Sequence, residues 1–171
     1  MKRTKITKGS PYRVFMGVDN GVSGAITILS ESGIVLLHIK TPIKNCLNYT
    51  KKKAFMNRVN FPKLKRILSS WENNCTPFCM IERPMVNPMR WVASVSALRC
   101  LEASEILLEE LQIPYQFIDS KEWQKALLPS GLKGPQLKKA ALDVAKRLFP
   151  KQVIVNADAL LIAEHCRRTR K

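Results

Sequence analysis

Apolar runs along the chain alternate with polar turns, and their lengths and spacing predict both strands and helices. Three runs rich in β-forming residues come first, at residues 12–18, 24–29 and 34–40. The connections between them are short and carry the turn-forming residues Asp, Asn, Ser and Gly. This pattern predicts an antiparallel meander of three strands.

The rest of the chain predicts helices separated by two further strands. Apolar residues at helical spacing indicate helices over residues 61–71, 91–111, 136–148 and 156–167, and Asp119-Ser120 can cap a short helix that ends near residue 127. Apolar runs at residues 78–82 and 113–118 predict the fourth and fifth strands. Residues 44–60 are polar and basic, and we expect a loop or a short helix there.

The order βββαβαβαα implies an α/β protein with one mixed five-stranded sheet flanked by helices, which is the arrangement of the RNase H-like fold. The 171 residues suit one domain, expected over residues 11–168, with a flexible basic arm at 1–10 and a basic tail at 169–171. No apolar run reaches the roughly 18 residues of a membrane span, so we expect no membrane association. Many activities share this fold, so the chemistry needs separate evidence.

Charge and cysteine content narrow the class of partner and the compartment. Lys and Arg number 29 against 13 Asp and Glu, giving a net charge of +16, which favours a nucleic-acid partner. The five cysteines are an odd number, which argues against a closed disulfide framework and favours free thiols in a reducing, intracellular compartment. Such compartments include the cytoplasm of a bacterium or a virus-infected cell, and an organelle. Cys75 and Cys79 have a spacing that zinc sites sometimes use, but no second Cys/His pair follows at a suitable distance.

Three acidic residues occupy positions that suggest chemistry. Asp19 ends the first predicted strand, Glu82 ends the fourth, and Asp158 opens the last helix. If those two strands are neighbours, Asp19 and Glu82 lie side by side at the sheet edge where ligands bind in open sheets. Each acid also has an ordinary explanation: a turn residue, an ion-pair partner of Arg83, or an acid favoured by a helix N-terminus.

Acids that lie together repel one another unless cations hold them. Mg²⁺ prefers oxygen ligands, and paired divalent ions can promote phosphodiester cleavage. A basic chain with an acidic metal site therefore suggests a nuclease. Gly17, Gly21 and Gly24 around Asp19 also resemble the phosphate loop of sugar-kinase and actin-type ATPases, but that class needs two such domains and a second glycine-rich loop.

Three segments together resemble the RuvC type of Holliday-junction resolvase. They are residues 16–26 (MGVDNGVSGAI), 80–84 (MIERP) and 157–163 (ADALLIA), and residues 123–126 and 138–150 resemble the region between the last two. The resemblance covers most of residues 14–167 in the order of the family. It implies Asp19, Glu82 and Asp158 as catalytic metal ligands for Mg²⁺ or Mn²⁺, with no small-molecule cofactor.

The resemblance also implies a homodimer formed through the long helix after Glu82, and symmetric nicking of four-way DNA junctions in DNA recombination and repair. Lys138 matches a position where relatives often carry a lysine near the scissile phosphate, and Lys125 is a weaker candidate for that role. Relatives usually have a fourth ligand three or four residues before the last Asp. Ile154 and Val155 stand there in this chain, so Asn156 is the candidate for an additional oxygen ligand.

Basic residues near the acids and in the segment 44–60 are candidate DNA contacts. Besides Lys125, the candidates are Lys51, Lys52, Lys53, Arg58, Arg83, Arg90 and Trp91. A solvated basic face explains any one of the cations equally well. For Trp91 the alternatives are stacking on an unpaired base and packing as the first core residue of its helix.

Three functions remain open on these grounds. The first is a Mg²⁺-dependent endonuclease that resolves four-way junctions. The second is an RNase H-like nuclease that acts on other branched or hybrid nucleic acids. The third is a junction-binding protein with weak or lost catalysis, which the missing fourth ligand favours.

Overall fold

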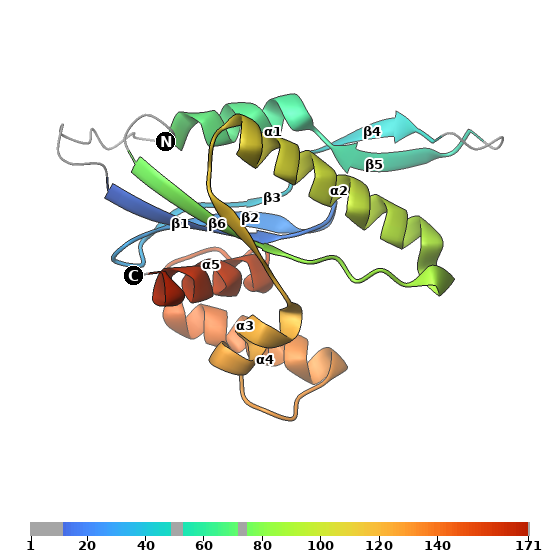
Figure 1. The fold of residues 1–171 in the computed structure, drawn as a ribbon. Coiled ribbons are helices and arrows are strands. Elements are labelled where there is room, and N and C mark those ends of the chain that lie inside the picture. The colour runs from blue at the N-terminus through green and yellow to red at the C-terminus, as the bar shows by residue number, and fades with distance from the viewer. Residues whose placement is uncertain (1–11, 49–52, 72–74, 171) are drawn as a thin grey trace.

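The computed structural model describes residues 12–48, 53–71 and 75–170, which form a mixed sheet with helices on both faces (Figure 1). Five strands pair in the order β3-β2-β1-β6-β7. They are β1 (Tyr12–Asp19), β2 (Ala25–Ser30), β3 (Val35–Lys40), β6 (Cys75–Glu82) and β7 (Tyr115–Ile118). The first three strands pair antiparallel, whereas β6 pairs parallel to both β1 and β7. The predicted mixed five-stranded sheet is confirmed.

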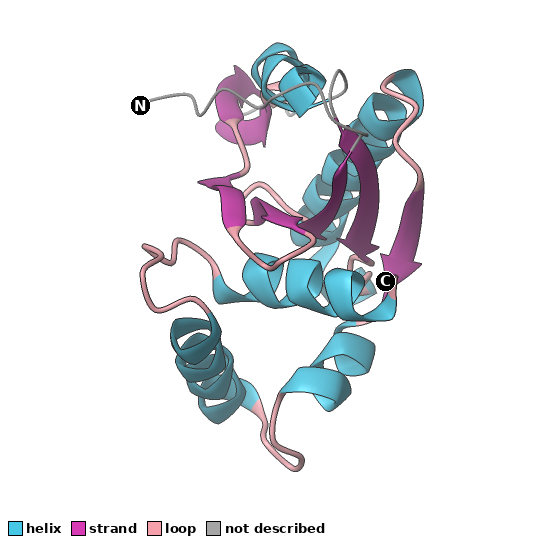
Figure 2. Cartoon of the chain, turned by 90° about the vertical axis from the view of Figure 1, so that its left-hand side faces the viewer, coloured by secondary structure: helices cyan, strands magenta, loops and turns pink. Residues whose placement is uncertain are grey.

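Helices cover the two faces of this sheet unequally (Figures 1 and 2). One face carries α1 (Phe61–Leu68) and α2 (Trp91–Glu110), and the other carries α3 (Ser120–Leu127), α4 (Gly134–Leu148) and α5 (Ala157–Thr169). Short 3₁₀ turns, η1 (Ser69–Trp71) and η2 (Pro88–Arg90), follow α1 and precede α2. No helix in the described ranges is long and apolar enough to cross a membrane.

The central strand β1 supplies both hydrophobic cores. Successive side chains of a strand point to opposite faces. Phe15 therefore packs with α5 on one side, while Val14, Met16 and Val18 pack with α1 and α2 on the other. This is why β1 reads as a continuous apolar run rather than an alternating one.

The expectation of a loop or a short helix over residues 44–60 is wrong. This segment contains a separate antiparallel hairpin, β4 (Ile43–Leu47) and β5 (Phe55–Val59). Most of its described residues stay at least partly exposed, so the hairpin tolerates many polar and basic side chains and its composition resembles that of a loop. The expected arm at residues 1–10 and the candidates Lys51 and Lys52 lie outside the described residues.

Helix α5 lies against β1 with almost no space between the two backbones. A Cβ atom built on Gly17 would lie 2.6 Å from the carbonyl oxygen of Ala159 and closer still to the amide nitrogen of Ala163. Real Cβ atoms do not approach backbone that closely, so this contact needs glycine in β1. It fixes the height of α5, and therefore of Asp158, above the sheet.

We expect Gly17→Ala to lower the free energy of unfolding by about 3 kcal/mol or more, because α5 would have to move off β1. Urea denaturation at neutral pH measures the loss. The matched control is Gly131→Ala, where a Cβ meets nothing within 4 Å although the φ of +82° is unfavourable for alanine. That control should lose about 1 kcal/mol. Equal losses in both variants would contradict a tight contact at Gly17.

Candidate active site

Strand pairing and helix packing bring Asp19, Glu82 and Asp158 to one edge of the sheet. Strands β1 and β6 are parallel neighbours with Val18 opposite Ile81, so Asp19 and Glu82 leave the sheet side by side. Asp158 lies in the first turn of α5, which packs on β1 and β6. The two strands whose acids were expected to meet are therefore neighbours.

The carboxyl groups of the three acids share a partly buried environment that opposes their ionisation. The pKa of Asp19 is raised to about 6, mainly by burial and also by the nearby Glu82, while a hydrogen bond from Asn156 lowers it. Burial likewise raises the pKa of Glu82 and of Asp158. Asp158 repels both other acids, and the two carboxyl groups of Asp19 and Glu82 are within hydrogen-bonding reach of each other. A cation among them would relieve this strain.

The indole of Trp123 orients Glu82. Trp123 lies on α3 with 1% of its surface exposed, and its Nε1 donates a hydrogen bond to Glu82 Oε1 at 3.0 Å. In the sequence Trp123 belonged only to a segment of general resemblance, and its role was missed. The available signal was a large aromatic residue in a short, mostly polar helix, since a buried indole N–H needs an acceptor.

Asn156 links the start of α5 to Asp19. Its Oδ1 accepts a hydrogen bond from the backbone N–H of Ala159 at 2.9 Å, as an N-cap does, and its Nδ2 donates to Asp19 Oδ2 at 2.6 Å. In this arrangement the amide nitrogen of Asn156 points to the site, while its amide oxygen is bonded to the backbone of α5. A role for Asn156 as an oxygen ligand for metal stays a prediction.

His38 holds the backbone just before α5, a role that was not predicted from the sequence. Its Nε2 accepts hydrogen bonds from the N–H groups of Val155 at 3.1 Å and Asn156 at 3.4 Å. Its Nδ1 lies 2.8 Å from Oγ1 of Thr27 and donates to it, because a neutral ring whose Nε2 accepts carries its proton on Nδ1. Burial lowers the pKa of His38 to about 4, which keeps the ring neutral as these bonds require.

The predicted lysine at the site lies on α4. Lys138 is exposed, and its ammonium lowers the pKa of Asp158 against the effect of burial, which places it near that acid. Lys125 is an exposed residue in the last turn of α3. Roles near a scissile phosphate stay predictions for both lysines.

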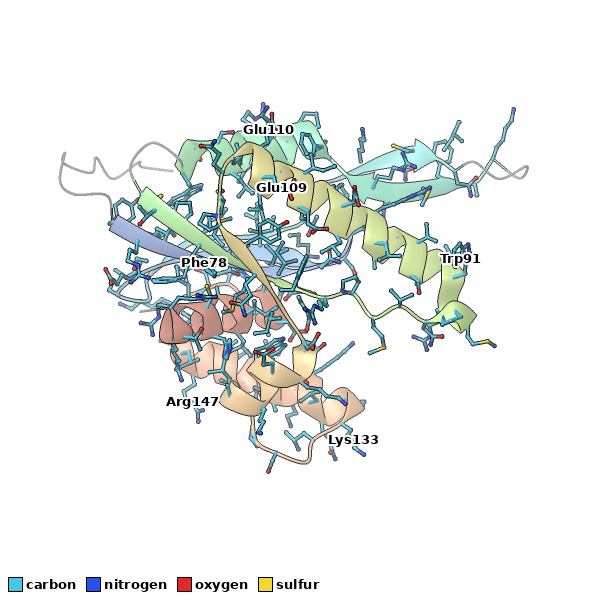
Figure 3. All side chains as sticks on the ribbon, in the orientation of Figure 1. Phe78, Trp91, Glu109, Glu110, Lys133 and Arg147 are labelled. Atoms are coloured by element: carbon cyan, nitrogen blue, oxygen red, sulfur yellow. The ribbon has the colours of Figure 1, made fainter. Side chains whose placement is uncertain are left out.

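The other DNA-contact candidates are spread over the molecule. Arg83 directly follows β6, forms an exposed ion pair with Asp119 at 3.5 Å and lies over the ring of Phe117. Arg90 and Trp91 lie at the end of α2 remote from Glu109 and Glu110 (Figure 3).

The side chain of Trp91 is 68% exposed, so the interpretation of Trp91 as the first core residue of its helix is wrong. Lys53 is exposed just before β5, and Arg58 lies within β5, on the hairpin.

The donor set suits a hard divalent cation. In the ranges 12–48, 53–71 and 75–170, no three His, Cys, Asp or Glu side chains already form a ready metal cluster. The three acids nevertheless offer only carboxylate oxygens, the ligands that Mg²⁺ and Mn²⁺ prefer. Their pKa values are raised mainly by burial and in part by mutual repulsion, and a bound cation would offset both. Cys75, Cys79, Cys100 and Cys166 are buried, as expected for packed thiols.

We expect Asp19→Asn to stabilise the metal-free protein at pH 7.5 by about 1–3 kcal/mol. The pKa of Asp19 is about 6 in the folded chain and about 4 in the unfolded chain, so the wild type loses stability as pH rises through this window. The gain should vanish by about pH 3, where the Asp19 carboxyl group is neutral in both the folded and the unfolded wild type. Urea unfolding in EDTA at the two pH values measures it, with the exposed Asp143→Asn as control. If the variant were less stable than wild type at pH 7.5, ionised Asp19 would not destabilise the folded protein and the prediction would be wrong.

We expect His38→Leu to lower the free energy of unfolding by about 1–3 kcal/mol, because two backbone N–H groups and the Thr27 hydroxyl lose their partner. His38→Gln keeps an acceptor near the position of Nε2 and should recover about half of the loss. Chemical denaturation at pH 7.5 makes the comparison. If glutamine were no better than leucine, the hydrogen bonds to Val155 and Asn156 would not explain the role of the ring.

Comparison with known proteins finds a likeness to solved structures. No protein-family model and no curated protein sequence matches the chain. The solved structure of T. thermophilus RuvC in complex with Holliday junction substrate superposes with a TM-score of 0.61 and 12% identity, over 93% of this chain and 96% of that one. A second structure of Thermus thermophilus RuvC gives a TM-score of 0.56 and 14% identity, over 92% and 95%. The expected RNase H-like fold is confirmed, and it is the fold of RuvC.

Proposed function

We propose that this protein is a Mg²⁺-dependent endonuclease that resolves four-way DNA junctions. The observation that carries the proposal is the convergence of Asp19, Glu82 and Asp158 at one sheet edge of a chain with net charge +16. The RuvC fold supports it, because the similar structure is described in complex with a Holliday junction. Mn²⁺ is the alternative metal.

In the proposed mechanism the chain's own residues hold and orient the acidic site. Asp19, Glu82 and Asp158 would supply carboxylate oxygens to the metal, while Trp123 and Asn156 fix the directions of Glu82 and Asp19. Divalent cations bound there would promote attack of water on the phosphodiester and offset charge on the leaving oxygen. Lys138, beside Asp158, would attract the phosphate being cut.

A homodimer would make two symmetric nicks, one from each subunit. The start of α2 and the loop before it expose several large apolar side chains, which suit a protein–protein or base-stacking contact. They include Met85, Met89, Trp91 and Val92, each more than two thirds exposed. Arg83 and Arg90 in the same region would contact DNA backbone, as would Lys125 on α3 and the hairpin cations Lys53 and Arg58.

A second function, junction binding without cleavage, is favoured by the segment before α5. The side chains of Val155 and Ile154 offer no metal ligand. The amide nitrogen of Asn156, rather than its amide oxygen, faces Asp19. This arrangement leaves three carboxylates where relatives usually have four ligands. Such a site binds metal more weakly, so the test includes Mn²⁺ at millimolar concentration.

The test is incubation with a labelled four-way junction, a flap, an RNA–DNA hybrid and a linear duplex, each with Mg²⁺ or Mn²⁺. We expect paired symmetric nicks on the junction alone. Asp19→Asn and Glu82→Gln should each reduce the rate by about 100-fold or more, since each removes a metal ligand. Asp143→Asn, on the exposed side of α4, is the matched control and should cut normally. Tight junction binding without cleavage in either metal would establish the second function instead.

A further inference from the structure

The hairpin and helix α2 enclose a cavity that the proposed reaction does not use. It has a volume of about 290 Å³ and lies where β5 contacts α2. We call it the hairpin–helix hollow. Among its lining residues are three cations, Lys44, Arg58 and Arg99, and three apolar side chains, Val22, Met56 and Ala103. Figure 1 shows β4 and β5 beside α2 on the face of the sheet opposite α5.

The three cations come from separate elements and converge on the hairpin–helix hollow. Lys44 on β4 is directly opposite Arg58 on β5, a pairing of like charges that destabilises an antiparallel ladder. Arg99 reaches from α2 to the hairpin, with Nη1 3.9 Å from Sδ of Met56. Cations held together in this way favour an anion between them.

The shape and lining of the hollow indicate which anion fits. Arginine guanidinium groups match the oxygens of a phosphate, and the lysine adds a point charge. The apolar side chains Val22, Met56 and Ala103 offer a surface for the sugar or base attached to that phosphate. A nucleotide unit of a nucleic-acid strand combines these two properties.

The hollow adjoins the acidic site through the loop that follows Asp19. Val22 belongs to this loop, and Asn20 in the same loop donates from Nδ2 to the carbonyl oxygen of Ala97 on α2 at 3.1 Å. Cys100, which also lines the hollow, is near enough to Gly21 and Asp19 for both to influence the pKa of its thiol. One short loop therefore connects the acidic site with the hollow.

We propose that the hairpin–helix hollow binds one backbone phosphate of the strand whose neighbouring linkage lies at the acidic site. Lys44, Arg58 and Arg99 hold the phosphate, and the apolar wall contacts the attached nucleoside. The hollow thereby sets the register of the strand relative to the three acids. This inference rests on the proposed function for the identity of the strand, but its binding test does not require cleavage.

The first measurement is binding of a labelled four-way junction in EDTA over a range of salt concentrations. We expect Lys44→Gln, Arg58→Gln and Arg99→Gln combined to weaken binding about tenfold, and to reduce the slope of log K against log salt by about one. The slope should fall by one rather than three because the three cations share one phosphate. Lys146→Gln, Arg147→Gln and Lys151→Gln combined, on and just after α4, form the control with the same charge change. Equal changes in affinity and in salt slope in both triple variants would overturn the proposed phosphate site.

The second measurement places a single uncharged methylphosphonate linkage at successive positions of the junction strand. We expect one position to weaken wild-type binding and to have no further effect in the hollow triple variant, whose thermal melting must match wild type. If no position behaves in this way, the proposal fails. Calorimetric binding of a mononucleotide through the same three cations, without any effect on the junction, would also overturn it in favour of a small-molecule site.

The two proposals fail separately. Position-specific loss of binding in a protein that cuts none of the substrates would support the hollow while refuting the nuclease. Symmetric nicking by both wild type and the hollow triple variant, with equal affinity, would support the nuclease while refuting the hollow.

Discussion

The close contact between α5 and β1 is the constraint on which the rest of the site depends. Asp19 and Glu82 are placed by strand pairing alone, but Asp158 belongs to a helix that could sit at many heights above a sheet. The absence of a side chain at Gly17 lets the helix backbone at Ala159 and Ala163 approach the strand directly. At that separation the first turn of α5 lies near enough for Asp158 to repel both Asp19 and Glu82.

Hydrogen bonds then turn this coarse placement into a defined set of carboxyl directions. Trp123 reaches Glu82 from α3, and Asn156 reaches Asp19 from the start of α5. The neutral ring of His38 joins β3 to the same backbone turn. Asp19 and Glu82 are therefore each held by an element other than their own, so orientation of the site depends on the packed fold rather than on any single loop.

The sequence was sufficient for the architecture because its strongest signals are periodic and local. The apolar run of β1 and the acid at its end could be recognised directly, and so could the strand that ends at Glu82. The hairpin β4–β5 was missed because its strands are short and largely exposed, and it forms a separate sheet in which β5 packs on α2. The roles of His38 and Trp123 could not be found, since each depends on a partner more than 40 residues away in the chain. The exposure of Trp91 was equally hidden, because a helix pattern alone does not say which face stays uncovered.

The hairpin has a consequence for how such a protein can diversify. The two ends of the hairpin lie side by side, because the backbone N–H of Asn60 donates a hydrogen bond to the carbonyl oxygen of Pro42 at 2.7 Å. The hairpin forms a two-stranded sheet separate from the main sheet. Insertions, deletions or recoded charges in this segment would leave the strand order and the three acids intact. Selection can therefore change the ligand contacts of the hairpin without changing the strands and helix that carry the three acids.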